Sequence, residues 1–224
     1  MDIDFFRDAP METSSGLALV TAARDEEREN ADALVARRYS SRGYASTRLS
    51  TYNEEALIVC SACQGVSTVG TVAVRFDSSS GFNADATFPT EMQELRESGE
   101  RICEFSRLAV DEDAADNKRV LARLFHVAYL HGHRLGACNL LVIEVNPRHV
   151  AFYRRLLGFT VRSEARINER VNAPSVLMTL DLRRAAEWIA MYGGNPALAG
   201  STRMLYPYFY GAGEETTVLA KLRQ

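Results

Sequence analysis

The fold of this chain is decided by Arg101–Phe159, RICEFSRLAVDEDAADNKRVLARLFHVAYLHGHRLGACNLLVIEVNPRHVAFYRRLLGF. The alternation within Ile102–Val110 predicts a strand that directs its even-numbered residues, Glu104 and Ser106 among them, to one face and its odd-numbered residues to the other. A carboxylate in such a strand destabilises the protein unless it is paired or functional. We therefore expect Glu104 either to pair with an arginine or to act as an acid or base.

The remainder of this stretch predicts a helix, a strand and a second helix. Asp116–His133 is expected to be a helix because apolar residues recur at three- and four-residue spacing, at Leu121, Leu124, Phe125 and Ala128. The nearly continuous apolar run Cys138–Val145 is typical of a central strand covered on both faces. Asn146–Pro147 then begins a helix that Gly158 ends. Two strands joined through a helix indicate one parallel crossover.

The flanking sequence predicts further strands and helices. Expected strands and helices are Leu17–Ala22 (strand), 24–44 (helix), Glu55–Ala62 and Thr68–Phe76 (antiparallel strands with a turn at Gln64–Gly65), Pro89–Ser98 (helix), and Thr160–Ala165 with Ser175–Leu182 (antiparallel strands). The order contains a single strong parallel crossover. The predicted fold is therefore mixed α/β, with helices on both faces of a largely antiparallel sheet.

Composition limits the classes of function. The chain has 224 residues, 46% hydrophobic and 25% charged, which is typical of a globular protein, and its net charge of -3 gives no general attraction to nucleic acid. An acidic N-terminus and the absence of a long apolar run predict a cytoplasmic protein with no integral membrane segment. Cys60, Cys63, Cys103 and Cys138 are then expected to be reduced thiols, and no metal site is expected.

Two motifs resemble those of a known family. NPRHVAFYRRLLGF and the SRLAVD that precedes a long helix are similar to motifs of the GCN5-related N-acyltransferase superfamily. The resemblance covers about Leu17–Leu182 and implies the acyl-CoA N-acyltransferase fold. It divides the chain into an N-acyltransferase domain, residues 1–182, and a C-terminal helix with an aromatic-rich extension, residues 183–224, packed on the same domain.

The chain departs from that superfamily at the turn that would bind coenzyme A. Members that use acyl-coenzyme A carry a glycine-rich turn there, whose backbone N–H groups hold the pyrophosphate. This sequence has DEDAADNKRVLARL instead, with no glycine between Gly99 and Gly132. Lys118, Arg119 and Arg123 suit a single phosphate on an acidic carrier protein, near a helix start that favours anions. The alternative is that they form an ordinary solvated helix face.

A narrower likeness follows from EFSR. This segment is similar to the Glu-x-Ser-Arg signature of acyl-homoserine-lactone synthases and of the long-chain N-acyl amino acid synthases. Both take acyl groups from acyl carrier protein, so the resemblance implies that partner, an amino acid acceptor and no separate cofactor. The lactone synthases carry an N-terminal tryptophan, whereas the only tryptophan here is Trp188. The N-acyl amino acid synthases are therefore the better match.

The resemblance assigns roles to individual residues. Glu104 would take the proton of the attacking amine, directly or through water, or would instead be a structural partner of Arg107 or another arginine. Ser106 would orient the acceptor or a water. Arg107 faces away on an ideal strand, but a β-bulge would bring it round to bind the acceptor carboxylate. Backbone groups of this strand would hold the pantetheine arm at Leu108, Ala109 and Val110.

Two further residues complete the expected site. Tyr153 would protonate the leaving thiolate, or would simply pack the second helix on the sheet. Asn146 lies where the two central strands are expected to separate, and it is a candidate contact for substrate. Near the C-terminus lies an aromatic cluster that consists of Tyr206, Tyr208, Phe209 and Tyr210. This cluster would either cover the acyl group or pack the C-terminal tail against the rest of the domain.

Three other functions remain open from the sequence. A coenzyme A-dependent acetyltransferase with a degenerate turn would share the fold and the chemistry. A lactone-forming synthase would share the carrier protein. A non-catalytic module that binds an acyl group or its carrier would not need Glu104 for binding.

Overall fold

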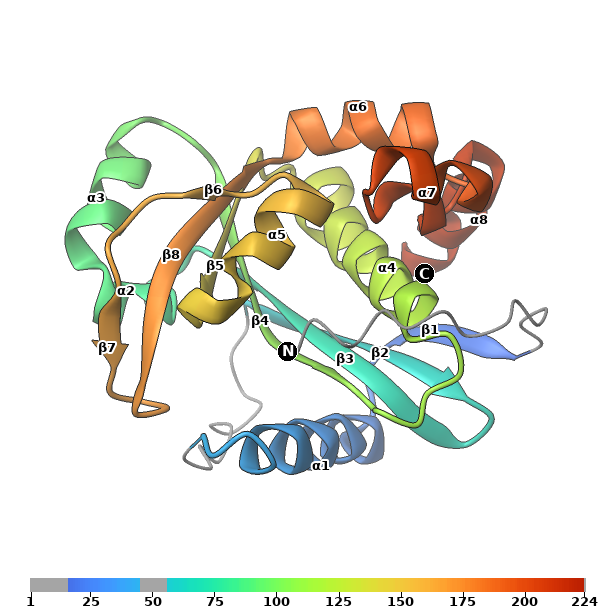
Figure 1. Ribbon diagram of the computed structural model, residues 1–224, viewed down its shortest axis with the longest axis horizontal. Helices are drawn as coiled ribbons and strands as arrows, with labels where there is room; N and C mark the ends of the chain where they lie inside the picture. Colours follow the sequence, from blue (N-terminus) through green and yellow to red (C-terminus); the bar gives the residue numbers. More distant parts are fainter. Residues whose placement is uncertain (1–15, 45–55, 224) are drawn as a thin grey trace.

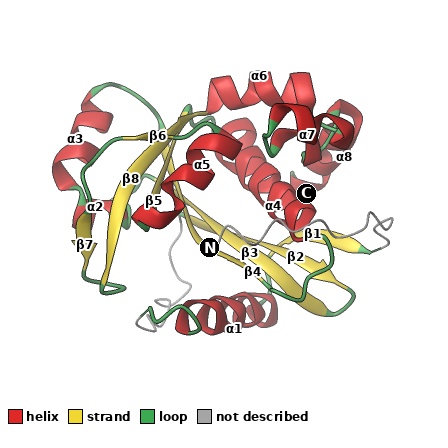
Figure 2. Ribbon diagram, in the orientation of Figure 1, coloured by secondary structure: helices red, strands yellow, loops and turns green. Residues whose placement is uncertain are grey.

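The structure is a computed structural model that describes residues 16–44 and 56–223. Figure 2 shows one sheet flanked by helices, with strand order β1-β2-β3-β4-β5-β8-β6 and β7 paired with β8. The strands are β1 Leu17–Thr21, β2 Leu57–Gln64, β3 Ser67–Phe76, β4 Ile102–Val110, β5 Leu140–Val145, β6 Thr160–Val161, β7 Arg166–Asn168 and β8 Ala173–Asp181. Among these, only β4 and β5 pair in parallel. The predicted mixed, mostly antiparallel sheet is confirmed.

The helices cover both faces of this sheet. In Figure 1, α1 lies below the sheet, α4 lies above it, and α2 with α3 covers the end near β7. The α-helices are α1 Asp25–Ser40, α2 Ala84–Thr87, α3 Pro89–Glu97, α4 Asn117–Tyr129, α5 Val150–Leu157, α6 Leu182–Tyr192, α7 Ala199–Thr202 and α8 Ala212–Leu222. Every residue of α4 from Val120 to Tyr129 is buried, because the sheet covers one side and the C-terminal helices cover the other.

Three segments differ from the sequence prediction. A short helix, α2, precedes Pro89, in a segment for which no helix was predicted. The first part of Thr160–Ala165 forms only the two-residue β6, and the chain then makes the separate hairpin β7–β8 with its turn at residues 169–172. The tail after Gly211 is helical, although its glycine and threonines favoured no helix prediction. The expected strand start at Glu55 lies outside the described residues.

Strand β4 contains a bulge at Arg107. Ser106 is opposite Ala73 of β3, but Ala109 is opposite Thr71, so β4 has one extra residue between the two pairs. Arg107 adopts a left-handed backbone with φ of 54°. L-residues other than glycine take this conformation at a cost, and such strain is common beside functional sites.

The bulge reverses the facing of the residues after it. Ala109 packs with α1, whereas Val110 lies in the core on the opposite face and Leu108 packs against that same core. The prediction that Leu108 and Val110 share the face of Glu104 is therefore wrong, because strict alternation ends at the extra residue. The bulge expected for Arg107 is present.

The parallel pairing of β4 and β5 ends early. Phe105 and Ile143 are the last paired residues, and both strands continue beyond them. The edge of β4 that faces β5 therefore has no partner strand after Phe105 in the described part of the chain. This leaves a gap in the middle of the sheet, next to the bulge at Arg107.

Candidate active site

The gap between β4 and β5 contains a cavity of about 160 Å³. Its walls come from both faces of the sheet: α1 and the β7–β8 turn contribute on one side, and α4 and α5 contribute on the other. The lining includes Tyr39, Arg42, Glu104, Ser106, Arg107, Glu144, Asn146, Tyr153 and Arg170. The sheet thus has an opening that connects a polar side, next to α1, with an apolar side, next to α4.

Glu104 is held firmly at the wall of this cavity. Its side chain is 1% exposed and accepts hydrogen bonds from the backbone N–H groups of Asn83 (3.0 Å) and Ala84 (2.9 Å) at the start of α2. Arg75, its neighbour on β3, lies 3.8 Å from one carboxylate oxygen. The expected arginine partner is therefore Arg75. Burial raises the pKa of Glu104, and the two backbone bonds oppose that shift only in part.

Ser106 is the last residue of β4 that pairs with β3 before the bulge, and Arg107 is the residue at the bulge. The Ser106 hydroxyl is buried and makes no hydrogen bond to any residue in the described ranges, although it lines the cavity. The guanidinium of Arg107 interacts electrostatically with Asp32 of α1, which places it on the polar side of the opening. Both side chains therefore face the polar side of the cavity together with Glu104.

A second carboxylate, which the sequence interpretation missed, faces the same cavity. Glu144 on β5 is on the same face of the sheet as Glu104, because residues 104 and 142 are paired neighbours. Its Oε1 accepts a hydrogen bond of 2.8 Å from Ser175, and its Oε2 lies 3.6 Å from the guanidinium of Arg170. The signal was present: Glu144 is the only charged residue of the run CNLLVIEV.

Tyr153 and Asn146 lie at the far end of the opening. Tyr153 is buried among the rings of Phe125 and Phe159, and burial raises the pKa of its hydroxyl. It therefore holds its proton at neutral pH. The Asn146 side chain accepts a hydrogen bond from the backbone N–H of Arg148, so it caps the turn that leads into α5 while it lines the cavity.

The start of α4 has acidic rather than glycine-rich surroundings. The Asp116 carboxylate accepts a hydrogen bond from the backbone N–H of Arg119, which occupies a group that an anion would otherwise bind. Asp111 and Glu112, just before it, pair with Arg37 and Arg38 of α1. A pyrophosphate here would meet several carboxylates. The side chains of Lys118 and Arg119 are only partly exposed.

Arg123 does not fit the carrier-binding role that the sequence suggested. Its guanidinium lies 3.7 Å from the centre of the Tyr210 ring and 3.4 Å from Glu214, and the side chain is only 8% exposed. The C-terminal segment covers this face of α4, so Arg123 binds the tail rather than solvent. His126, one turn further on, accepts a hydrogen bond of 2.8 Å from the backbone N–H of Tyr210.

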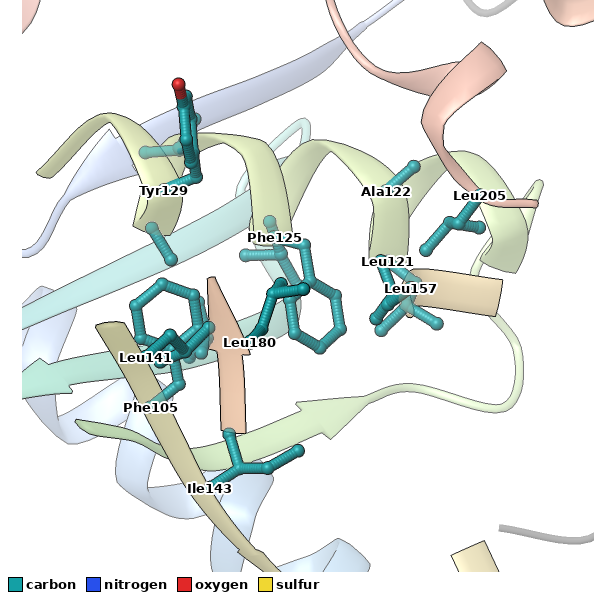
Figure 3. Packing of buried hydrophobic residues seen from close by; sticks show 14 of the residues in the cluster. Phe105, Leu121, Ala122, Phe125, Tyr129, Leu141, Ile143, Leu157, Leu180 and Leu205 are labelled. Atoms are coloured by element: carbon teal, nitrogen blue, oxygen red, sulfur yellow. The ribbon is translucent and has the colours of Figure 1, made fainter. Parts of the chain in front are cut away.

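A second, smaller cavity adjoins the first on the α4 side. It measures about 20 Å³, its lining is apolar, and it shares Phe105 and Phe125 with the larger cavity. Figure 3 shows Phe105 and Phe125 between β4 and α4, close to Leu141 and Leu180. The wall furthest from the sheet comes from α6 and the C-terminal aromatic cluster, through Ile189, Tyr206 and Phe209.

The architecture defines the class of protein. A putative N-acetyltransferase from Lactobacillus plantarum superposes with a TM-score of 0.56 at 15% identity, over 75% of this chain and 99% of its own. An acyl-CoA N-acyltransferase from Pseudomonas aeruginosa superposes with a TM-score of 0.53 at 14% identity, over 74% and 99%. The fold is that of the GCN5-related N-acyltransferases, as the sequence motifs predicted.

The family within this class is also defined. The family model of the N-acyl amino acid synthase FeeM matches residues 30–181, which is more than half of the chain. The structure of FeeM, an N-acyl amino acid synthase from uncultured soil microbes, has a TM-score of 0.69 at 24% identity, over 75% of this chain and 90% of its own. The chain belongs to the FeeM N-acyl amino acid synthase family and is an N-acyltransferase. No curated protein sequence matches it.

Two kinds of feature are absent from the described residues. No cluster of three or more His, Cys, Asp or Glu side chains within residues 16–44 and 56–223 is arranged to hold a metal ion. Within the same ranges, every helix is too short or too polar to cross a bilayer.

Proposed function

We propose that this N-acyltransferase transfers a long-chain fatty acyl group from the thioester of acyl carrier protein to the α-amine of an amino acid. The observation that carries the proposal is the opening between β4 and β5, which is polar on the α1 side and apolar on the α4 side. A charged acceptor and a hydrocarbon tail would enter from opposite faces and meet at the gap. Family membership supports the amino acid as acceptor.

The chemistry needs a base, because an amino acid carries an ammonium group at neutral pH. Glu104 is the proposed proton acceptor, acting directly or through water, since burial raises its pKa and two backbone bonds fix its position. The neutral amine attacks the thioester carbonyl, a C–N bond forms and an oxyanion develops. Collapse of the oxyanion breaks the C–S bond, and the amine nitrogen loses its second proton.

The leaving thiolate takes up a proton as it departs. Tyr153 is the proposed donor, because it lines the cavity and its hydroxyl carries a proton at neutral pH. The proton that the amine nitrogen loses on collapse replaces the one that Tyr153 gives. The net products are therefore an amide, a thiol and the one proton taken by Glu104.

The other predicted contacts complete the proposal. The Ser106 hydroxyl, which makes no hydrogen bond within the described ranges, would orient the acceptor or a water. Arg107 would bind the acceptor carboxylate from the polar side, in a two-pronged contact. Asn146, at the end of β5, is a proposed substrate contact. The unpaired edge of β4 would bind the pantetheine arm through the backbone of Leu108, Ala109 and Val110.

A carrier protein suits the start of α4 better than a free nucleotide. Asp116 already caps the helix, and Asp111 and Glu112 lie close by, so a coenzyme's pyrophosphate would face carboxylates at the place where it needs N–H groups. Lys118 and Arg119 are the proposed contacts for the single phosphate of phosphopantetheine. The donor then brings its own prosthetic group, and the enzyme needs no separate cofactor.

The second cavity is the proposed entrance to the acyl site, because of its lining. Its apolar lining continues from the gap past Phe105 and Phe125. At about 20 Å³ it has room for one water-sized group, so a long tail would enter only if these rings turned aside. Burying each further CH₂ there stabilises the complex by about 0.8 kcal/mol.

The proposal is tested by incubating the purified protein with a mixture of amino acids and an acyl donor of one chain length. The products are then identified by mass spectrometry. We expect N-acyl amino acids from long-chain acyl carrier protein, and far less product from the matching acyl-coenzyme A. Acetyl transfer from acetyl-coenzyme A, with retention on immobilised coenzyme A, would favour the acetyltransferase instead. An acyl-homoserine lactone product would favour a lactone synthase. Donor binding without any turnover, unchanged in Glu104→Gln, would favour a binding module.

A further inference from the structure

The cavity wall holds a buried carboxylate that is only half satisfied. Glu144 has a side chain that is 7% exposed, and its Oε1 accepts one hydrogen bond from the Ser175 hydroxyl. Its Oε2 is buried and accepts no hydrogen bond from any residue in the described part of the chain. The nearest cation, on Arg170, is 3.6 Å away, which is beyond hydrogen-bond distance.

An oxygen in this state needs a donor. Leaving a buried charged acceptor without its hydrogen bond is strongly unfavourable, so native proteins rarely keep such a group unless a ligand or water satisfies it. Glu144 lines the cavity of the proposed reaction site, and Ser106 of β4 lines the same cavity. A ligand with an N–H donor and a positive charge would satisfy Oε2.

Arg170 is positioned to release Glu144. Its backbone is fixed, because the Asn168 side chain accepts hydrogen bonds from the N–H groups of Arg170 and Val171 in the β7–β8 turn. Its side chain is 44% exposed and reaches over the cavity, where its charge also acts on Glu104 and Tyr39. A long, half-exposed side chain on a fixed turn can change partners without moving the backbone.

We propose that the pair Glu144–Arg170 is the recognition site for the two charges of the acceptor, an inference that rests on the proposed function. The ammonium group of the amino acid binds Glu144 Oε2. Its carboxylate binds Arg170, which turns away from Glu144, in addition to the contact proposed above for Arg107; both arginines line the cavity. An α-amino acid carries both charges on one carbon, so a single ligand satisfies both side chains. Neither the family match nor the motif EFSR assigns a role to these two residues.

This arrangement makes the enzyme specific for α-amino acids over simple amines. An amine without a carboxylate would occupy Glu144 and leave Arg170 without an anion, and its binding would lose one charged contact. An amino acid ester would fail in the same way. Glu144 also orients the amine nitrogen on the face of the sheet that carries Glu104, the proposed base.

The test compares acceptor kinetics of Glu144→Gln, Arg170→Met and the control Glu169→Gln, which changes an exposed residue of the same turn outside the cavity lining. For Glu144→Gln we expect the KM for the amino acid to rise about tenfold or more, with the donor KM unchanged. For Arg170→Met we expect the preference for the amino acid over its decarboxylated amine to fall about tenfold. Thermal stabilisation by the free amino acid should be lost in both variants and kept in the control.

The outcomes separate this inference from the proposed function. If the wild-type protein makes N-acyl amino acids while Glu144→Gln keeps the wild-type acceptor KM, the inference is wrong and the function stands. Full preference for amino acids in Arg170→Met would overturn the assignment of the carboxylate contact, even if Glu144→Gln proved too unstable to assay. If the wild-type protein makes no N-acyl amino acid, the proposed function fails first and the inference fails with it.

Discussion

The left-handed backbone at Arg107 makes replacement by glycine more favourable than replacement by alanine. An L-residue with φ near +54° costs about 1–2 kcal/mol, and glycine removes that cost. Glycine in turn lowers stability by about 0.5–1 kcal/mol, because the unfolded chain gains freedom. The difference predicts that Arg107→Gly has a free energy of unfolding about 0.5–1 kcal/mol higher than that of Arg107→Ala.

Urea unfolding at equilibrium measures this difference. Both variants lack the guanidinium, so they should lose N-acylation to the same extent although their stabilities differ. Ala18→Gly is the matched control, because Ala18 is an exposed residue of β1 with ordinary strand geometry. That control should lower stability by about 0.5–1 kcal/mol. If Arg107→Gly is instead less stable than Arg107→Ala by a similar amount, the reasoning about the bulge is refuted.

Three further variants test other parts of the account. Glu104→Gln should lower the free energy of unfolding, measured with urea, by about 2–3 kcal/mol, because one backbone N–H group at the start of α2 loses its acceptor. Unchanged stability would contradict a stabilising role for these two hydrogen bonds. Burial lowers the pKa of His126, so the stability should be full above about pH 6.5 and fall below it as the unfolded chain takes up a proton. The variant His126→Gln should flatten this dependence of the unfolding free energy on pH, measured by urea unfolding at several pH values. An equal slope in the variant would show that His126 is not the group responsible. Phe209→Leu should shift donor preference toward longer acyl chains in a mixture of thioesters, and an unchanged profile would exclude Phe209 from the acyl pocket.

Local patterns predicted much of the fold. The bounds of β4 follow from its alternation, and proline at the first position predicts the helical turn Pro147–His149 that leads into α5. The gap in the sheet could not be predicted in this way. It depends on how far β4 and β5 stay paired, and pairing length is a tertiary property that neither strand encodes alone.

The candidate site was predicted where it lies on one strand and missed where distant segments meet. Glu104 and Ser106 follow from one strand pattern. Arg170 comes from a hairpin turn, and nothing in its local sequence indicates that the turn reaches the cavity. Arg123 shows the opposite error: a cation on a helix was expected to face solvent, but the docked tail covers it with Tyr210.

The most direct test of the central claim is expression of the full chain in a bacterial host, with mass spectrometry of the lipid extract. The host supplies acyl carrier protein with its natural range of chain lengths and all the amino acids. We predict a new series of N-acylated amino acids whose members differ by two carbons. An extract that contains no such series, from cells with abundant folded protein, would contradict acyl transfer to an amino acid at the gap between β4 and β5.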